Sequence, residues 1–185
     1  MLIQNIIETI NNNNNVYVHG GPDPLDGNSL KRYGKRGQDM GALFFSKYNN
    51  SGIKYSMGYA IHSNPKSWAL YLVKINIPTD QIFDFTNKKH RMMAKSHLSP
   101  NQFDSWVRSS GSSGHLDWTS VDDELFEEMG FRAALFHERP ANFISDDAII
   151  SIGVFNASDV KIIEKIPAVE ARKRFKEIYN NMYSY

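Results

Sequence analysis

The chain has 185 residues, of which 41% are hydrophobic and 22% charged, the composition of an ordinary globular protein with the length of one domain. Its formal net charge of +1 gives no general attraction to nucleic acid or membranes, and the lack of cysteine excludes disulfides, thiolate metal sites and cysteine nucleophiles. Because there is no signal-peptide pattern and no apolar run near the roughly twenty residues of a membrane span, we expect a cytoplasmic protein with a single domain over residues 1–185.

The expected elements of the first half follow from hydrophobic spacing and breaker residues. Apolar residues recur at helical intervals over 2–10, and the five asparagines that follow predict a turn. Val16-Tyr17-Val18 predicts a strand that ends at the breaker cluster His19-Gly20-Gly21-Pro22. The elements expected next are an irregular stretch over 22–40, a strand over 41–46, a helix over 53–61, and strands over 68–77 and 82–85.

In the second half, Ser99-Pro100 indicates a helix start within a helix-and-loop stretch over 87–110. The run SSGSSG at 109–114 predicts a flexible loop by its composition, and Gly130 predicts the end of an acidic helix over 121–129. The remaining elements expected are strands over 131–136, 148–155 and 160–163, and a basic helix from Pro167 to about 183. Strands and helices without strict alternation favour an α+β fold.

Two segments carry the candidate chemistry. His19 stands at the expected end of a buried strand, and the glycines that follow would let a ligand approach the backbone closely. The second segment, GALFFS at 41–46, contains the adjacent Phe44 and Phe45. Two adjacent aromatic residues on a strand point to opposite faces, so one can pack in the core while the other lines a pocket.

In this order and spacing, the two segments resemble the ADP-ribosyltransferase superfamily, in its diphtheria-toxin-like and PARP-like branch with its small bacterial and phage toxins and effectors. A strand ending in His-Gly is followed by about twenty irregular residues, by Gly-x-x-Phe-Phe-Ser and by Tyr-Ala, as in that family. The segments GFRAAL at 130–135 and IGVFNASDVK at 152–161 are similar to its closing strands. The resemblance spans about residues 16–163 and implies an α+β core with a split mixed and antiparallel sheet and flanking helices.

The resemblance also implies that NAD is a co-substrate. His19 would bond the adenosine-side ribose, and the backbone of Gly20 would bond the nicotinamide amide. Phe44 would stack on nicotinamide, with Tyr55 or Tyr59 on its other face, while Phe45 would be core. The residues assigned to the dinucleotide are His19, Gly20, Gly21, Arg32, Arg36, Phe44, Ser46, Tyr55 and Tyr59.

Arg32 and Arg36 enter this set because they belong to a basic stretch between the two candidate strands. In the family this region lies near the phosphates, so either guanidinium could pair with the pyrophosphate, and a solvated basic loop is the alternative. Two further basic clusters, at 88–91 and 161–176, are candidates for nucleic-acid contact. No His, Asp or Glu set has metal-ligand spacing, so we expect no metal.

One position departs from the family pattern. Where the family has a catalytic glutamate that stabilises the positive charge formed as nicotinamide leaves, this chain has Ser151. Asp147 on the preceding loop could supply the carboxylate, and Glu138 at the end of the preceding strand is a second candidate. A catalytically inactive relative is the third reading.

The sequence therefore predicts an NAD-dependent ADP-ribosyltransferase, a glycosyltransferase that acts on a macromolecular target, with protein favoured over nucleic acid as the target. The alternative is a module that binds NAD or ADP-ribose, or a pseudoenzyme that acts by binding a partner. A transferase that uses NAD to remove a phosphate from RNA would share the fold, but it needs a set of basic residues that cannot be placed in this sequence.

Overall fold

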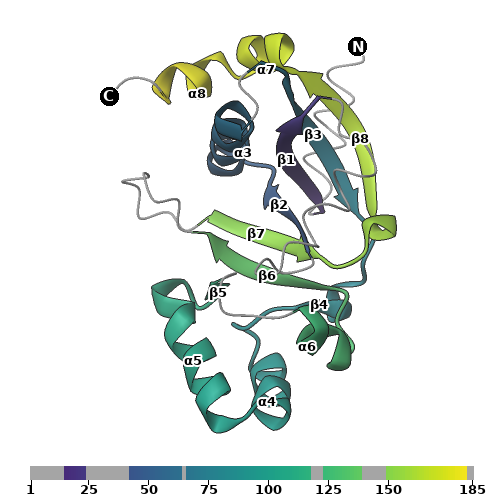
Figure 1. Ribbon diagram of the computed structural model, residues 1–185, viewed down its shortest axis with the longest axis vertical. Helices are drawn as coiled ribbons and strands as arrows, with labels where there is room; N and C mark the ends of the chain where they lie inside the picture. The colour runs from purple at the N-terminus through teal and green to yellow at the C-terminus, as the bar shows by residue number, and fades with distance from the viewer. Residues whose placement is uncertain (1–14, 24–41, 64–65, 118–122, 139–148, 183–185) are drawn as a thin grey trace.

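The computed structural model describes residues 15–23, 42–63, 66–117, 123–138 and 149–182, and the helix expected over 2–10 lies outside them. The strands are β1 (Val16–Pro22), β2 (Leu43–Lys47), β3 (Trp68–Ile75), β4 (Ile82–Phe83), β5 (Leu116–Asp117), β6 (Ala133–Glu138), β7 (Ile149–Val154) and β8 (Val160–Pro167). The α-helices, labelled in Figure 1, are α3 (Asn50–Ser63), α4 (Lys88–His97), α5 (Pro100–Ser110), α6 (Asp123–Glu128), α7 (Ala168–Arg174) and α8 (Lys176–Asn181).

All the described strands belong to one mixed sheet. Their order is β4-β6-β7-β2-β1-β3-β8, and β5 pairs with β6 beside this path. The central pairings are antiparallel, whereas β4 and β5 each run parallel to β6. Mixed strand directions and helices that do not alternate strictly with the strands confirm the α+β class. The two candidate segments form β1 and β2, which are neighbours in the middle of the sheet.

The ladder between β1 and β2 is short. It covers two pairs, Tyr17↔Lys47 and Val18↔Ser46, whereas β1 pairs with β3 along its whole length from Val16 to Pro22. In Figure 1, β1, β3 and β8 form one arm of the sheet, and β7 and β6 run across the direction of that arm. The junction of the two arms is the β1–β2 pair.

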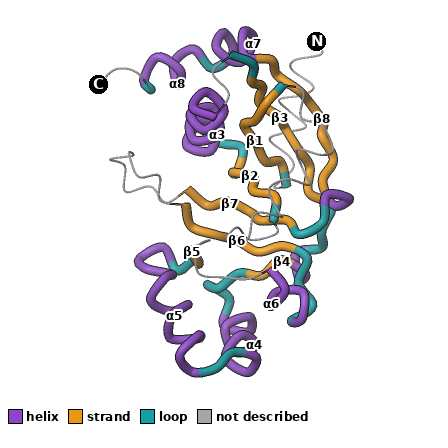
Figure 2. Tube along the Cα trace, viewed as in Figure 1, coloured by secondary structure: helices purple, strands orange, loops and turns teal. Residues whose placement is uncertain are grey.

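One face of the sheet carries helices at both ends, as Figure 2 shows. At one end, α3, α7 and α8 enclose an aliphatic core that includes Val18, Ile53, Met57, Leu70 and Leu72. At the other end, α4, α5 and α6 enclose an aromatic core that includes Phe83, Trp106, Phe126, Phe131 and Phe136. The opposite face contributes a third core, whose members come from both arms and include Phe45, Tyr71, Val73, Ile152 and Val154.

Most of the expected elements within the described residues are present, with three corrections. β1 does not end at His19 but continues through both glycines to Pro22, because its ladder with β3 is unbroken. The final helix is two helices, interrupted at Phe175, and β8 extends to Pro167.

The third correction concerns the run SSGSSG. It ends α5 and forms a 3-10 turn over Gly111–Ser113, because serine hydroxyls bond local carbonyls: Ser110 Oγ donates to Val107 O at 2.8 Å, and Ser113 Oγ donates to Ser110 O at 3.0 Å. By contrast, the helix start predicted at Ser99-Pro100 is confirmed, with Ser99 and Gln102 forming a capping box.

None of the helices in the described ranges combines the length and the apolar content that a bilayer crossing requires.

Candidate functional site

His19 joins the two central strands at the point where their ladder stops. Its Nδ1 lies 2.9 Å from the carbonyl oxygen of Phe44. A carbonyl oxygen only accepts, so Nδ1 carries the proton and Nε2 is the acceptor nitrogen. Burial lowers the pKa of His19, and the bond to the Phe44 carbonyl offsets part of that decrease. The imidazole is therefore neutral at pH 7, in one defined tautomer.

Strand alternation places the two phenylalanines on opposite faces. The His19 ring lies 5.6 Å from the ring of Phe45, and both belong to the face of the third core. Phe45 is 2% exposed, so its predicted place in the core is confirmed. Phe44 points to the helix-covered face, where its ring meets the edge of Phe136 at 5.6 Å. The structure therefore brings His19 next to the backbone of Phe44, and next to the side chain of Phe45.

The glycines at the end of β1 have a packing role that the sequence did not reveal. A Cβ on Gly20 would lie 1.8 Å from the carbonyl oxygen of Ser56 in α3. Ser56 Oγ also donates to Val18 O at 3.2 Å. Gly52 brings α3 equally close to β2, since a Cβ there would lie 2.0 Å from the carbonyl oxygen of Lys47. The close approach at Gly20 is therefore made by a helix of the protein itself.

Gly153 was missed by the sequence reasoning, although it contributes to the same region. It lies opposite Phe44 in the β2–β7 ladder. A Cβ on it would lie 2.9 Å from Cε2 of Phe136 and 3.2 Å from Cε1 of Phe44, so its absence makes room for both rings. The available signal was an isolated glycine within a strand pattern, which indicates a close approach.

Tyr55 and Tyr59 lie one turn apart on α3. Tyr55 is half-buried and Tyr59 is 40% exposed, and both flank the face of α3 that packs on the sheet. Gly20 and Phe44 project to this same side of the sheet, as their contacts with α3 and Phe136 indicate. Gly20 and Phe44 therefore lie on the helix-covered side of the sheet, and Tyr55 and Tyr59 lie on the helix α3 that packs on this side.

Ser151 occupies the expected position of the glutamate and faces Ser46 directly across the β2–β7 ladder. The two hydroxyl oxygens are 3.5 Å apart, with Ser46 3% and Ser151 1% exposed. Phe136 is the β6 neighbour of Ser151 in register. The centre of this face therefore holds a buried pair of hydroxyls in place of a carboxylate.

The other residues assigned to the site are only partly placed. Glu138 is the last residue of β6 and pairs in register with Ile149, two residues before Ser151. Arg32, Arg36 and Asp147 lie outside the described residues. Gly21 is buried in β1 opposite Ala69.

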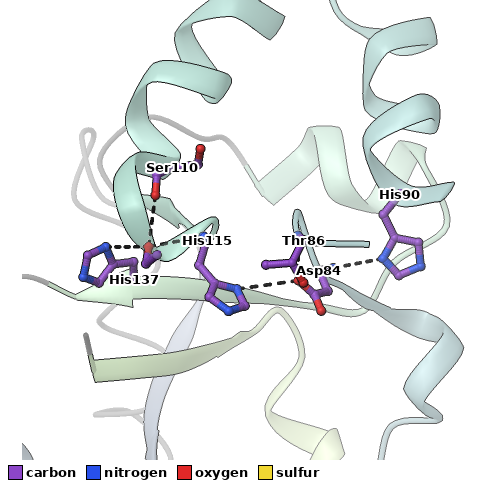
Figure 3. Close-up of polar contacts among 7 residues, drawn as sticks. Asp84, Thr86, His90, Ser110, His115 and His137 are labelled. Atoms are coloured by element: carbon purple, nitrogen blue, oxygen red, sulfur yellow. Dashed lines mark hydrogen bonds and ion pairs between the residues drawn. The ribbon is translucent and has the colours of Figure 1, made fainter. Parts of the chain in front are cut away.

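A second polar group lies beside β6 and β5 (Figure 3). Ser113 Oγ lies 2.8 Å from Nδ1 of His137, and Nδ1 of His115 lies 3.6 Å from Oδ1 of Asp84. Ser113 Oγ also donates to the carbonyl of Ser110 and accepts from the N–H of His115 at 3.3 Å. A hydroxyl engaged by these three groups anchors the turn and joins it to β6.

Among the described residues, no three His, Asp or Glu side chains are grouped so as to hold a metal ion. Comparisons with protein-family models, with curated proteins and with solved structures find no match for this chain. The functional assignment therefore rests on the residues and the geometry described above.

Proposed function

We propose that this protein is an NAD-dependent ADP-ribosyltransferase whose dinucleotide site lies at the junction of β1 and β2. The observation that carries the proposal is the bond from His19 Nδ1 to the Phe44 carbonyl at 2.9 Å. The two segments whose order resembles the ADP-ribosyltransferase superfamily are 25 residues apart in the chain, yet they are adjacent strands joined by this bond. The short β1–β2 ladder also agrees with the split sheet of that fold.

His19 has the chemistry that the proposed role requires. A neutral imidazole whose Nδ1 donates to a carbonyl has Nε2 as its acceptor nitrogen, the type of atom to which a ribose hydroxyl can donate. Burial lowers the pKa of this imidazole, which keeps it neutral near pH 7. Because the Phe44 carbonyl already holds the His19 ring in place, the ring loses little further conformational freedom when a ligand binds.

The nicotinamide end would lie on the helix-covered face with Phe44 and the α3 tyrosines, whereas the His19 ring projects to the opposite face. The dinucleotide would therefore have to pass between β1 and β2, where their ladder stops. Aromatic rings on a strand and on the helix above it can hold a flat ring between them. Ser46, below the first turn of α3, lies on the same face, and its Cβ is 3.1 Å from the position of a Cβ on Gly52. Arg32 and Arg36 remain the candidates for the pyrophosphate.

In the reaction, the bond between nicotinamide and ribose C1 breaks and its electron pair leaves with nicotinamide. A nucleophilic atom of the macromolecular target forms the new bond to C1 and releases its proton; water as the acceptor would give free ADP-ribose. Positive charge develops on the ribose, and a carboxylate would stabilise it. Glu138 and Asp147 are the candidates, because Glu138 pairs with Ile149, two residues before Ser151, and Asp147 precedes Ser151 by four residues in the sequence.

The test is nicotinamide release from NAD, measured chromatographically for the wild type and for Glu138→Gln, Asp147→Asn and Asp104→Asn. Loss of the stabilising carboxylate should lower the rate by about two to three orders of magnitude. Asp104→Asn, a change to an exposed acid on α5, should retain the wild-type rate and serves as the matched control. Wild-type activity that neither of the first two changes reduces would contradict the carboxylate assignment.

The second candidate function is an NAD- or ADP-ribose-binding module without turnover. It is favoured by the buried Ser46–Ser151 pair, which supplies no negative charge at the position where the family has its glutamate. Calorimetric titration distinguishes the two functions. Tight NAD binding without nicotinamide release, with or without a target protein, would support the binding module and overturn the transferase.

A further inference from the structure

We propose that α4 is a docking surface for an acidic protein partner, separate from the proposed dinucleotide site. Figure 1 shows α4 at the end of the molecule away from α3. The helix, KKHRMMAKSH, contains four lysine and arginine residues and no acidic residue. The charge of this one helix therefore greatly exceeds the +1 of the whole chain.

Helical spacing gathers these cations on the solvent side. Lys88, Arg91, Met92 and Lys95 recur at intervals of three and four residues, so they form one ridge, and all four are exposed. The buried residue of the helix is Ala94. Within the described ranges, none of the ion pairs involves a cation of α4.

The cations in the first turn of α4 oppose the stability of the helix, which argues that folding alone does not explain them. Lys88 and Lys89 stand in the first turn, next to the N-cap Asn87, where the positive end of the helix dipole disfavours cations. Lys88, Arg91 and Lys95 also repel one another along the ridge. Violations of local rules of this kind concentrate where a surface serves a function.

Apolar groups in and beside the ridge favour a protein over a nucleic acid. Met92 is 64% exposed and Met93 38% exposed, and methionine adapts to irregular protein surfaces. Stacking of single-stranded nucleic-acid bases uses exposed aromatic rings, and α4 contains no phenylalanine, tyrosine or tryptophan. His90 is stacked on Phe83 and is not available for such a role. A partner surface with carboxylates around an apolar centre fits this ridge.

The test is fluorescence anisotropy without NAD, so that it can fail independently of the proposed transferase. The probes are a labelled synthetic helical peptide of glutamate and leucine, and a single-stranded RNA of the same net charge. The combined change Lys88→Glu, Arg91→Glu and Lys95→Glu should weaken peptide binding by about tenfold or more, because three exposed attractions become repulsions. Met92→Ser should weaken peptide binding by about threefold, through lost apolar contact, and leave RNA binding unchanged.

The matched control changes three exposed lysines elsewhere, Lys161→Glu, Lys173→Glu and Lys176→Glu, and alters the total charge equally. It should change peptide affinity by less than about twofold. Equal losses in both triple variants would mean that only total charge matters and would overturn the proposal. RNA binding tighter than peptide binding and lost in the α4 variant would assign the ridge to nucleic acid, and a wild type that binds no peptide would also overturn the proposal.

Discussion

The two ends of the helix-covered face are held together in different ways. At the α3 end, the fixing contacts join segments that are distant in the chain: His19 to Phe44, Ser56 to Val18, and Gly20 to the backbone of α3. At the α4–α5 end, many of the polar contacts are local, such as Thr86 to Asp84 and Ser110 to Val107. The core at this end is built largely from aromatic side chains, whereas the α3 end depends on close contacts between a helix and the backbone of the strands.

The comparison indicates where substitutions will be tolerated. Backbone in close approach cannot adapt to an added carbon, whereas a cap or a turn can vary without moving the sheet. The proposed dinucleotide site lies at the rigid α3 end, and the proposed docking ridge lies at the α4–α5 end, where substitutions are better tolerated. This division is expected when a rigid scaffold holds a binding site and a more variable surface contacts a partner.

The largest expected effect is at Gly20. Gly20→Ala should lower the free energy of unfolding by about 3 kcal/mol or more, because its Cβ would lie 1.8 Å from the Ser56 carbonyl oxygen. Gly58→Ala on α3 is the matched control: its Cβ would meet only the terminal Cε of Met182 at 3.2 Å, so it should be neutral or stabilising by up to about 1 kcal/mol. Urea unfolding measures both. Equal destabilisation by the two changes would contradict the rigid-end interpretation.

The next effect concerns His19 and pH. His19→Ala should cost about 2–3 kcal/mol, since it removes a part-buried hydrogen bond and the contact with Phe45. Because burial lowers the pKa of His19, the unfolded state binds more protons below pH 6.5, the ordinary histidine value. The stability contributed by neutral His19 is therefore complete above pH 6.5 and is lost as pH falls from there towards the folded-state pKa.

Urea unfolding midpoints between about pH 5 and 8 test this sign. The pKa of His115 is also lowered by burial, with a partial offset from Asp84, so both histidines contribute in the same direction. His19→Asn and His115→Asn should each flatten the acid side of the profile, the first more than the second. A profile that His19→Asn leaves unchanged would show that this imidazole is not held neutral by the fold.

The central strands also show what the sequence can and cannot predict. Most strand and helix segments, the helix start at Ser99-Pro100 and the core place of Phe45 follow from local pattern and composition. The register of the strands does not follow from local pattern, because it depends on pairing with distant segments. A shift of one residue in the register exchanges the two faces of a strand. His19 therefore lies beside Phe45 on one face, and Phe44 points to the other.

For the candidate site, the sequence proposes the residues, whose functional roles stay predictions, but it does not give their contacts. The resemblance proposes Ser151 as the position where a glutamate is expected, but its partner Ser46 across the ladder depends on the β2–β7 register. Gly20 was recognised as a close-approach residue, yet the approaching group is α3, which no local pattern around Gly20 indicates. The extension of β1 past Gly20 and Gly21 likewise comes from the long β3 ladder overriding local breaker residues.

A smaller effect tests the hydroxyl contacts of the other end. Ser113→Ala should cost about 1–2 kcal/mol, since it removes the hydroxyl bonded to His137 at 2.8 Å and to the Ser110 carbonyl. Ser110→Ala removes a single bond to its own helix and should cost less than about 1 kcal/mol. Thermal unfolding compares the two. A loss after Ser113→Ala as large as that of Gly20→Ala would mean that this end is as rigid as the other.

The smallest expected effect is a gain in stability on α4. Lys88→Glu replaces a cation at the start of the helix with an anion that the dipole favours, and should stabilise the fold by about 0.3–1 kcal/mol at low salt. Lys95→Glu makes the same change in the last turn, where the dipole favours a cation, so it should destabilise by a similar amount. Unfolding midpoints at low and high salt measure both, and screening should reduce both effects. If the two changes in stability have opposite signs, Lys88 lowers the stability of the fold, which is what a surface kept for binding requires. If they have the same sign, the effect depends on total charge alone, and this support for the docking proposal is lost.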